Sequence, residues 1–183
     1  MRNAIKMISV LTIVGLISGA ALVLVYSYAN PLIEKNKKNE MKKAIFRIFP
    51  DGKSYTGETV DEVDVFRVKN AEDTFIGYAF LAEGNGYQGV IEMMAGISPD
   101  METVVGLEIL DSQETPGLGG EIATDKFTSQ FKALKAAPEI AYVKNVKPAR
   151  PNEIQAITGA TISSRAVVTI LNETIKKIKG KLK

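Results

Sequence analysis

Three short segments of the sequence combine residue types that could bind or carry a phosphorylated ligand. The first is Thr158-Gly159-Ala160-Thr161, where a loop of small residues enters a C-terminal segment with helical periodicity. Helix N-termini bind phosphate through free backbone N–H groups and the positive end of the helix dipole. Gly159 and Ala160 allow a phosphate to approach the backbone closely, and a flanking hydroxyl could accept a covalent phosphoryl group. The same residue types also fit an ordinary helix cap made by Thr158 or Thr161.

The other two segments are rich in glycine. Residues 114–120 read ETPGLGG, so backbone groups are exposed around Leu118 and can approach a planar ring closely. An ordinary turn before a short helix fits these residues too. Residues 84–89 read GNGYQG and precede a predicted strand, which fits either a hairpin turn or a loop facing a ligand. Tyr87 is therefore either a core or rim aromatic or a contact to a bound ring.

The composition excludes several kinds of chemistry, because the chain has neither cysteine nor histidine. Thiolate-ligated iron-sulfur clusters, disulfides and thiol catalysis are excluded. Imidazole bases, His-ligated haem and the usual zinc sites are excluded as well. Any redox chemistry therefore needs an organic cofactor. The 23 basic and 21 acidic residues nearly balance, so no global field indicates a nucleic-acid partner.

An apolar segment near the N-terminus predicts a single membrane-spanning helix. Residues 7–28 carry no charge, and at about 1.5 Å per residue they can cross a hydrocarbon core of about 30 Å. A cleaved signal peptide is the alternative, although Ser27-Tyr28-Ala29 is a poor cleavage site. The lysines at residues 35–43 favour a cytoplasmic domain by the positive-inside rule. That rule is weak where a long domain follows the helix, so the sequence alone leaves the sidedness open.

The remaining residues predict an α+β domain with an antiparallel sheet and flanking helices. We expect a membrane anchor at 1–30, a helical stalk at 31–52 that begins afresh after Pro31, and a domain at 53–183. Alternating patterns predict four strands in meander order, at 63–68, 75–81, 90–97 and 104–110, with a turn at 70–73 between the first two. Helices are predicted at 124–135 and 161–179, with a short strand at 142–146 between them. The last helix has an inward stripe that begins at Ile162.

Taken together, four features resemble the G subunit of the Rnf electron-transport complex. They are the N-terminal anchor, GYQGVIEMMAGIS at 86–98, ETPGLGGEI at 114–122 and TGATISSRAV at 158–167. The resemblance covers nearly the whole chain. The C subunit of the sodium-translocating NADH:quinone reductase shares the same flavin-binding domain, but it is usually longer, so the short chain favours the Rnf type.

The resemblance implies one FMN, bound covalently through its phosphate to Thr161. A flavin transferase would install the FMN from FAD with magnesium. The resemblance further implies two groups of contacts. Thr158, Gly159 and Ala160 would line the phosphate end, and Glu114, Thr115, Gly117 and Leu118 would pack near the isoalloxazine, with Tyr87 as a further candidate.

The implied function is that of an electron carrier that catalyses little by itself. It would work with other subunits in a single-pass, membrane-bound complex that couples ferredoxin and NAD electron transfer to Na⁺ or H⁺ transport, with its flavin domain outside the cytoplasm. Three alternatives remain: the quinone-reductase C subunit, a flavin-free assembly module anchored in the membrane lipid, and an independent flavin reductase. No G-x-G-x-x-G nicotinamide motif supports the last one.

Two positions depart from the family pattern. Gln155 stands three residues before Thr158, where relatives commonly have aspartate, and Glu153 is nearby. If the transferase reads that carboxylate, loading of this chain is less efficient. Ser112-Gln113 precedes the ETPGLG segment, where many relatives have a basic residue, so no proton-relay role is expected at that position.

Overall fold

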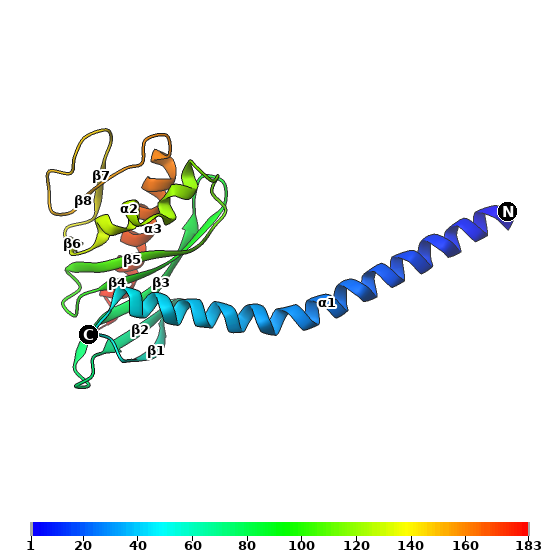
Figure 1. Cartoon of the computed structure of the whole chain (residues 1–183), viewed down its shortest axis with the longest axis horizontal. Coiled ribbons are helices and arrows are strands. Elements are labelled where there is room, and N and C mark those ends of the chain that lie inside the picture. Colours follow the sequence, from blue (N-terminus) through cyan, green and yellow to red (C-terminus); the bar gives the residue numbers. More distant parts are fainter. Residues whose placement is uncertain (1, 183) are drawn as a thin grey trace. The chain divides into compact units, whose positions relative to one another are not determined.

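The computed structural model describes residues 2–182, and it begins with one long helix, α1 (Arg2–Ile48) (Figure 1). The helix continues through Pro31, so the predicted new start after this proline is wrong. Proline removes one intrahelical hydrogen bond, and the helix-forming residues on both sides favour continuation. Contacts within the chain define two compact units, Met1–Glu40 and Met41–Lys183. The division into 1–30, 31–52 and 53–183 expected from the sequence remains a prediction.

The first unit is an exposed apolar helix. Within residues 2–182, one helix, Asn3–Ile48, is long and apolar enough to cross a membrane by its length and composition. Its large apolar side chains are exposed, as in Leu11 at 70% and Leu22 at 72%. Because soluble proteins rarely expose so large an apolar surface, this helix is consistent with a membrane anchor.

A six-stranded antiparallel sheet forms the centre of the second unit, in the simple order β1-β2-β3-β4-β5-β6. The strands are β1 (Ser54–Val60), β2 (Val63–Lys69), β3 (Phe75–Asn85), β4 (Val90–Ile97), β5 (Thr103–Ser112) and β6 (Leu134–Lys135). All four predicted strands are present as β2 to β5. The sequence missed β1 because its side chains are mostly exposed on both faces and show no apolar alternation.

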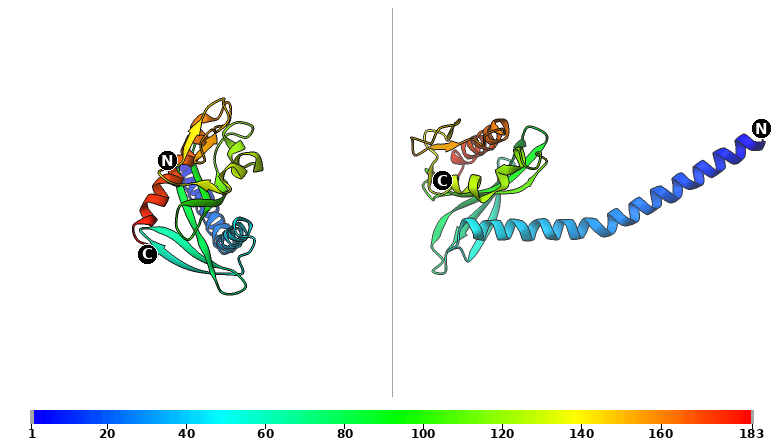
Figure 2. Two further views of the ribbon diagram at one scale, coloured as in Figure 1. Left: turned by 90° about the vertical axis from the view of Figure 1, so that its left-hand side faces the viewer. Right: turned by 45° about the horizontal axis from the view of Figure 1, so that its top comes forward.

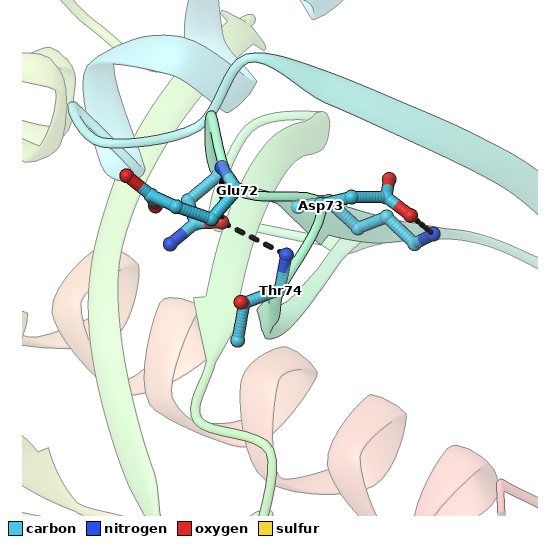
Figure 3. A network of polar contacts seen from close by, with 5 residues as sticks. Glu72, Asp73 and Thr74 are labelled. Atoms are coloured by element: carbon cyan, nitrogen blue, oxygen red, sulfur yellow. Dashed lines mark hydrogen bonds and ion pairs between the residues drawn. The ribbon is translucent and has the colours of Figure 1, made fainter.

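The turn between β2 and β3 lies where the sequence predicts it. The Asn70 side-chain oxygen accepts hydrogen bonds from the backbone N–H groups of Glu72 (3.1 Å) and Thr74 (2.9 Å) (Figure 3). Lys69 pairs with Asp73 across the same turn at 2.9 Å. Asn and Asp are favoured in such turns because their short side chains replace backbone partners.

The predicted helix at 124–135 is shorter in the structure. It consists of α2 (Asp125–Thr128) and a 3₁₀ turn, η2 (Ser129–Phe131), after which β6 begins. Another 3₁₀ helix, η1 (Gly119–Ala123), precedes α2. Phe127 and Phe131 are buried, as two side chains on one face of a helix would be, but Leu134 pairs with Val104 of β5 instead of extending the helix. The sheet pairing therefore overrides the local helical pattern.

The chain then forms a small parallel pair, β7 (Ala141–Val143) and β8 (Glu153–Gln155), before the last helix. The predicted strand at 142–146 is thus partly confirmed by β7, and β8 was missed. Helix α3 (Thr161–Lys179) has the predicted bounds.

The two faces of the sheet are covered by different helices. Residues 44–49 pack against Val68, Ala79 and Met94 on one face, and α3 covers the other with Val167, Leu171 and Ile178 (Figure 2). Gly84 in β3 allows close packing, because a Cβ atom there would lie 2.6 Å from Cγ1 of Ile170. This close approach fixes the middle of α3 against the end of β3. The fold class expected from the sequence is confirmed.

Candidate functional site

The three segments singled out in the sequence meet at the N-terminus of α3, around a cavity of about 450 Å³. The residues that line it are Tyr87, Glu114, Thr115, Leu118, Gly119, Gly159, Ala160, Thr161, Ile162 and Ser163. Two candidates are absent from this lining. Gly117 shapes a turn at its edge, and Thr158 lines a neighbouring cavity instead.

A tight turn places Leu118 at the cavity. The N–H of Leu118 donates to the carbonyl of Thr115 at 3.1 Å, with Pro116 and Gly117 in the two central positions. Gly117 has φ of +75°, which is the conformation a type II turn requires there. The turn leaves the Leu118 side chain 52% exposed.

A second turn of the same kind faces the first. The N–H of Ala160 donates to the carbonyl of Ile157 at 3.0 Å, and Gly159 has φ of +84°. A Cβ atom on Gly159 would lie 3.7 Å from Cδ2 of Leu118, so the two turns lie on opposite sides of one narrow space.

Ser164 holds the second turn in place. Its hydroxyl is fully buried, donates to the carbonyl of Ala160 at 3.0 Å and accepts the N–H of Ile157 at 3.0 Å. One side chain in the first turn of α3 therefore closes the loop that leads into the helix. Sequence reasoning did not single out this residue, since a serine in a helix gives no local sign of such a contact.

The helix N-terminus itself has no side-chain cap within the described residues. Ala160 occupies the N-cap position and makes no side-chain hydrogen bond. The simple capping role considered for Thr158 and Thr161 is therefore wrong. The Thr158 hydroxyl donates to Oδ1 of Asn145 at 3.4 Å, and Thr161 is half-buried at the first helical position. First-turn N–H groups without a side-chain acceptor are the usual partners of a bound phosphate.

Glu114 joins all three segments through its carboxylate, although it is only 6% exposed. Oε1 accepts the N–H groups of Tyr87 (2.6 Å) and Gln88 (3.0 Å), and Oε2 accepts the hydroxyl of Ser163 (2.6 Å). Gly119 is required here because a Cβ atom would collide with both Glu114 and Ser163.

The hydrogen bonds determine the charge state of this carboxyl. Burial alone raises the pKa of Glu114, but the bonds from the Ser163 hydroxyl and from the backbone of residues 87–89 outweigh it. The pKa of Glu114 therefore lies below its ordinary value, and the side chain is ionised at neutral pH. Ser163, like Ser164, was not identified from the sequence.

Most of the large apolar side chains that are exposed in the second unit line this cavity. Large apolar side chains that are exposed in residues 41–182 are Tyr87, Val90, Leu118, Val146 and Ile162. Three of them line this cavity, with exposed fractions of 66% for Tyr87, 52% for Leu118 and 47% for Ile162. The prediction that Ile162 points inward is thus wrong, because the residue faces the cavity at the end of the helix. Apolar side chains gathered at one hollow indicate a ligand with an apolar face.

A second cavity, of about 370 Å³, lies beside residues 155–158 and includes Gln155 and Thr158 in its lining. The backbone of Gln155 is fixed by the Gln130 side chain, which accepts its N–H at 2.8 Å and donates to its carbonyl at 3.2 Å. Glu153, two residues earlier, has hydrogen-bond partners of its own. Its Oε2 accepts the N–H groups of Ala149 and Arg150, and these bonds lower the pKa of Glu153.

The chain is similar to several known proteins. Residues 86–176 match the model of a family described as the FMN-binding domain. The G subunit of the ion-translocating oxidoreductase complex of Methanosarcina acetivorans is 30% identical over 95% of this chain and 94% of its own length. The G subunit of the proton-translocating ferredoxin:NAD(+) oxidoreductase complex of Clostridium ljungdahlii is 32% identical over 92% and 88%.

Among solved structures, NqrC of Shewanella oneidensis has the same fold. The TM-score is 0.58 with 21% identity, and the match covers 66% of this chain and 63% of that protein. The chain therefore spans somewhat less than two thirds of the length of this crystal structure.

Proposed function

The chain belongs to the family of G subunits of ion-translocating oxidoreductase complexes, and we propose that it carries one FMN, bound to Thr161 by a phosphoester, as an electron carrier. One observation carries the proposal. Three exposed apolar side chains and a helix N-terminus without a side-chain cap line the same cavity. A flavin mononucleotide needs both features, one for its planar ring and one for its phosphate.

The residues present fit this group. A volume of about 450 Å³ lies within the range of small-molecule sites, which is about 300–1,000 Å³. Tyr87, Leu118 and Ile162 offer apolar surface to an isoalloxazine ring. Gly159 leaves the approach to the first turn of α3 open, because only Leu118 lies within 4 Å of a Cβ atom placed there.

The attachment step requires a partner enzyme, a flavin transferase that uses FAD and magnesium. The Thr161 hydroxyl oxygen forms a bond to the FMN phosphorus of FAD, the P–O–P bond breaks, AMP leaves and the hydroxyl proton is released. The Thr161 side chain is half-buried, so the transferase can reach it without unfolding α3. The turn closed by Ser164 holds residues 157–160 in one conformation beside the cavity during this reaction.

FMN supplies one- and two-electron transfer when bound. Tyr87, Leu118 and Ile162 would offer the apolar contacts that hold the ring and exclude water from it, and the first turn of α3 would hold the phosphate. In this proposal α1 anchors the protein, with residues 1–30 in the lipid, a stalk at 31–52 and the flavin domain at 53–183 outside the cytoplasm.

The complex we propose is of the Rnf type, which couples ferredoxin and NAD electron transfer to Na⁺ or H⁺ transport. Support comes from relatives matched along almost their full length, one of which is described as part of a proton-translocating ferredoxin:NAD(+) oxidoreductase complex. The quinone-reductase C subunit is the second candidate. Its fold is shared, but the match to NqrC leaves more than a third of that protein uncovered.

The test is the intact mass of the full chain expressed with a flavin transferase. We expect the mass of FMN less one water on the wild type and on the control Thr158→Ala, and none on Thr161→Ala. In-gel flavin fluorescence after denaturation must follow the same pattern. Flavin retained covalently by Thr161→Ala would refute the attachment site. A wild type without flavin would favour the assembly module instead.

A further inference from the structure

We infer that the carboxylate of Glu114 lowers the midpoint potential of a flavin held in this cavity, because it is a buried negative charge that forms no ion pair with a cation in residues 2–182. The inference depends on the proposed function, since it concerns a flavin attached at Thr161. It assigns to Glu114 an electrostatic role beyond that of a residue packed near the ring.

The partners of Glu114 are all neutral. Backbone N–H groups of residues 87–89 and the Ser163 hydroxyl donate to it, and no lysine or arginine among residues 2–182 forms an ion pair with it. The other residues that line the cavity are apolar, hydroxyl-bearing or glycine. Glu114 is therefore the one formally charged side chain in the lining.

A charge in this position acts on anything in the cavity. The Glu114 side chain is 6% exposed, so water screens its charge poorly. The cavity is about as wide as the Debye length at physiological salt, which is about 8 Å, so the electrostatic field of Glu114 reaches a ligand anywhere in the cavity. Full reduction of a flavin takes up two electrons from the donor and one or two protons from solvent. A nearby anion opposes the uptake of electrons, so the midpoint potential is lower than it would be without Glu114.

The site allows the charge to be removed without changing its shape. In Glu114→Gln, the amide oxygen can accept the N–H groups of Tyr87 and Gln88, and the amide nitrogen can donate to Ser163 Oγ. The serine hydroxyl accepts where it previously donated, so each contact remains possible. Glu121→Gln is the matched control, because Glu121 lines the neighbouring cavity and not this one.

The experiment is a spectroelectrochemical titration of the full chain in detergent, reduced by dithionite in the presence of mediators. Each variant is first shown by intact mass to carry FMN. We expect a more positive midpoint potential for Glu114→Gln and an unchanged one for Glu121→Gln. Ser163→Ala keeps the charge while it removes one hydrogen bond, so its potential should not rise.

Equal potentials for wild type and Glu114→Gln would overturn the inference, and so would an equal rise in Ser163→Ala. If Glu114→Gln does not fold, Glu114→Ala decides, because it removes the charge and leaves space for water to accept the N–H groups of Tyr87 and Gln88. Its midpoint potential must be more positive than that of the wild type, and no rise overturns the inference. These outcomes differ from failure of the proposed function, in which the wild type carries no flavin on Thr161.

Discussion

Replacing Ser164 by alanine should destabilise the domain and slow the attachment of flavin at the same time. The Ser164 hydroxyl makes two hydrogen bonds, to the carbonyl of Ala160 and from the N–H of Ile157, both at 3.0 Å. The Ala160 carbonyl keeps a second donor, the N–H of Ser164, also at 3.0 Å. The N–H of Ile157 has no such replacement, but Ile157 is half-buried and water can reach it.

The expected loss follows from these contacts. Each neutral hydrogen bond contributes about 1 kcal/mol net, so two lost bonds give about 2 kcal/mol of free energy of unfolding. A fully buried, unsatisfied N–H would cost more, but the partial exposure of Ile157 limits this term. For a domain of this size the change corresponds to a Tm lower by about 6–10 °C.

The assay is thermal unfolding of the full chain in detergent, followed by the near-ultraviolet circular dichroism of its tyrosines. Thr169→Ala on the exposed face of α3 is the control and should leave the Tm within about 2 °C, as surface substitutions usually do. The rate at which flavin transferase loads Thr161 should fall in Ser164→Ala only, because the turn at 157–160 is no longer held. A Tm for Ser164→Ala equal to that of the control would refute the structural role of the hydroxyl.

Three further predictions concern packing, pH and recognition. Gly84→Ala should lower the free energy of unfolding by about 1–3 kcal/mol, because the new methyl group overpacks against Ile170. The decrease should be smaller in an Ile170→Ala background, where the colliding atoms are absent, and equal decreases in both backgrounds would contradict the contact. The pKa of Glu114 is lowered by folding, so its contribution to stability is present above the ordinary value of 4.5 and is lost as pH falls below it. In urea titrations, the free energy of unfolding should therefore fall more steeply with decreasing pH below 4.5 for wild type than for Glu114→Gln. The same pH dependence in both proteins would contradict this. Gln155→Asp should raise the rate of flavin loading on Thr161 in a timed mass assay. Gln155→Asn, which has the size of aspartate without its charge, is the control, and equal rates for the two variants would show that the transferase does not read a carboxylate at position 155.

The parts of the fold that could be predicted are those in which apolar residues recur in a regular strand or helix pattern. Strand β2 and the first half of β5 alternate between buried and more exposed positions, β3 and β4 are apolar runs buried on both faces, and α3 has a repeating apolar stripe. All five elements therefore follow from local pattern. Strand β1 has no buried face and gives no such signal. The helix predicted at 124–135 failed because Leu134 obtains its partner from β5, a strand distant in the chain.

The candidate site was predicted as three loops, and the structure brings them together. The contacts within the site could not be predicted from the sequence. Glu114 and Ser163 are 49 residues apart, and nothing local indicates that their side chains meet. Ile162 lies on the expected stripe of α3, but at the first turn that stripe extends past the sheet and faces the cavity.

The neighbouring serines at the start of α3 limit how the chain can change length. Successive residues of a helix point about 100° apart, so Ser163 and Ser164 serve two different loops from one turn. Ser163 contacts the loop at 114 and Ser164 the loop at 157–160. One residue inserted before Ser163 within α3 would rotate both hydroxyls away together. An insertion within 114–118 or 157–160 would open one of the two turns that these serines contact. Length variation should therefore be tolerated outside these two loops and excluded from them and from the first turn of the helix.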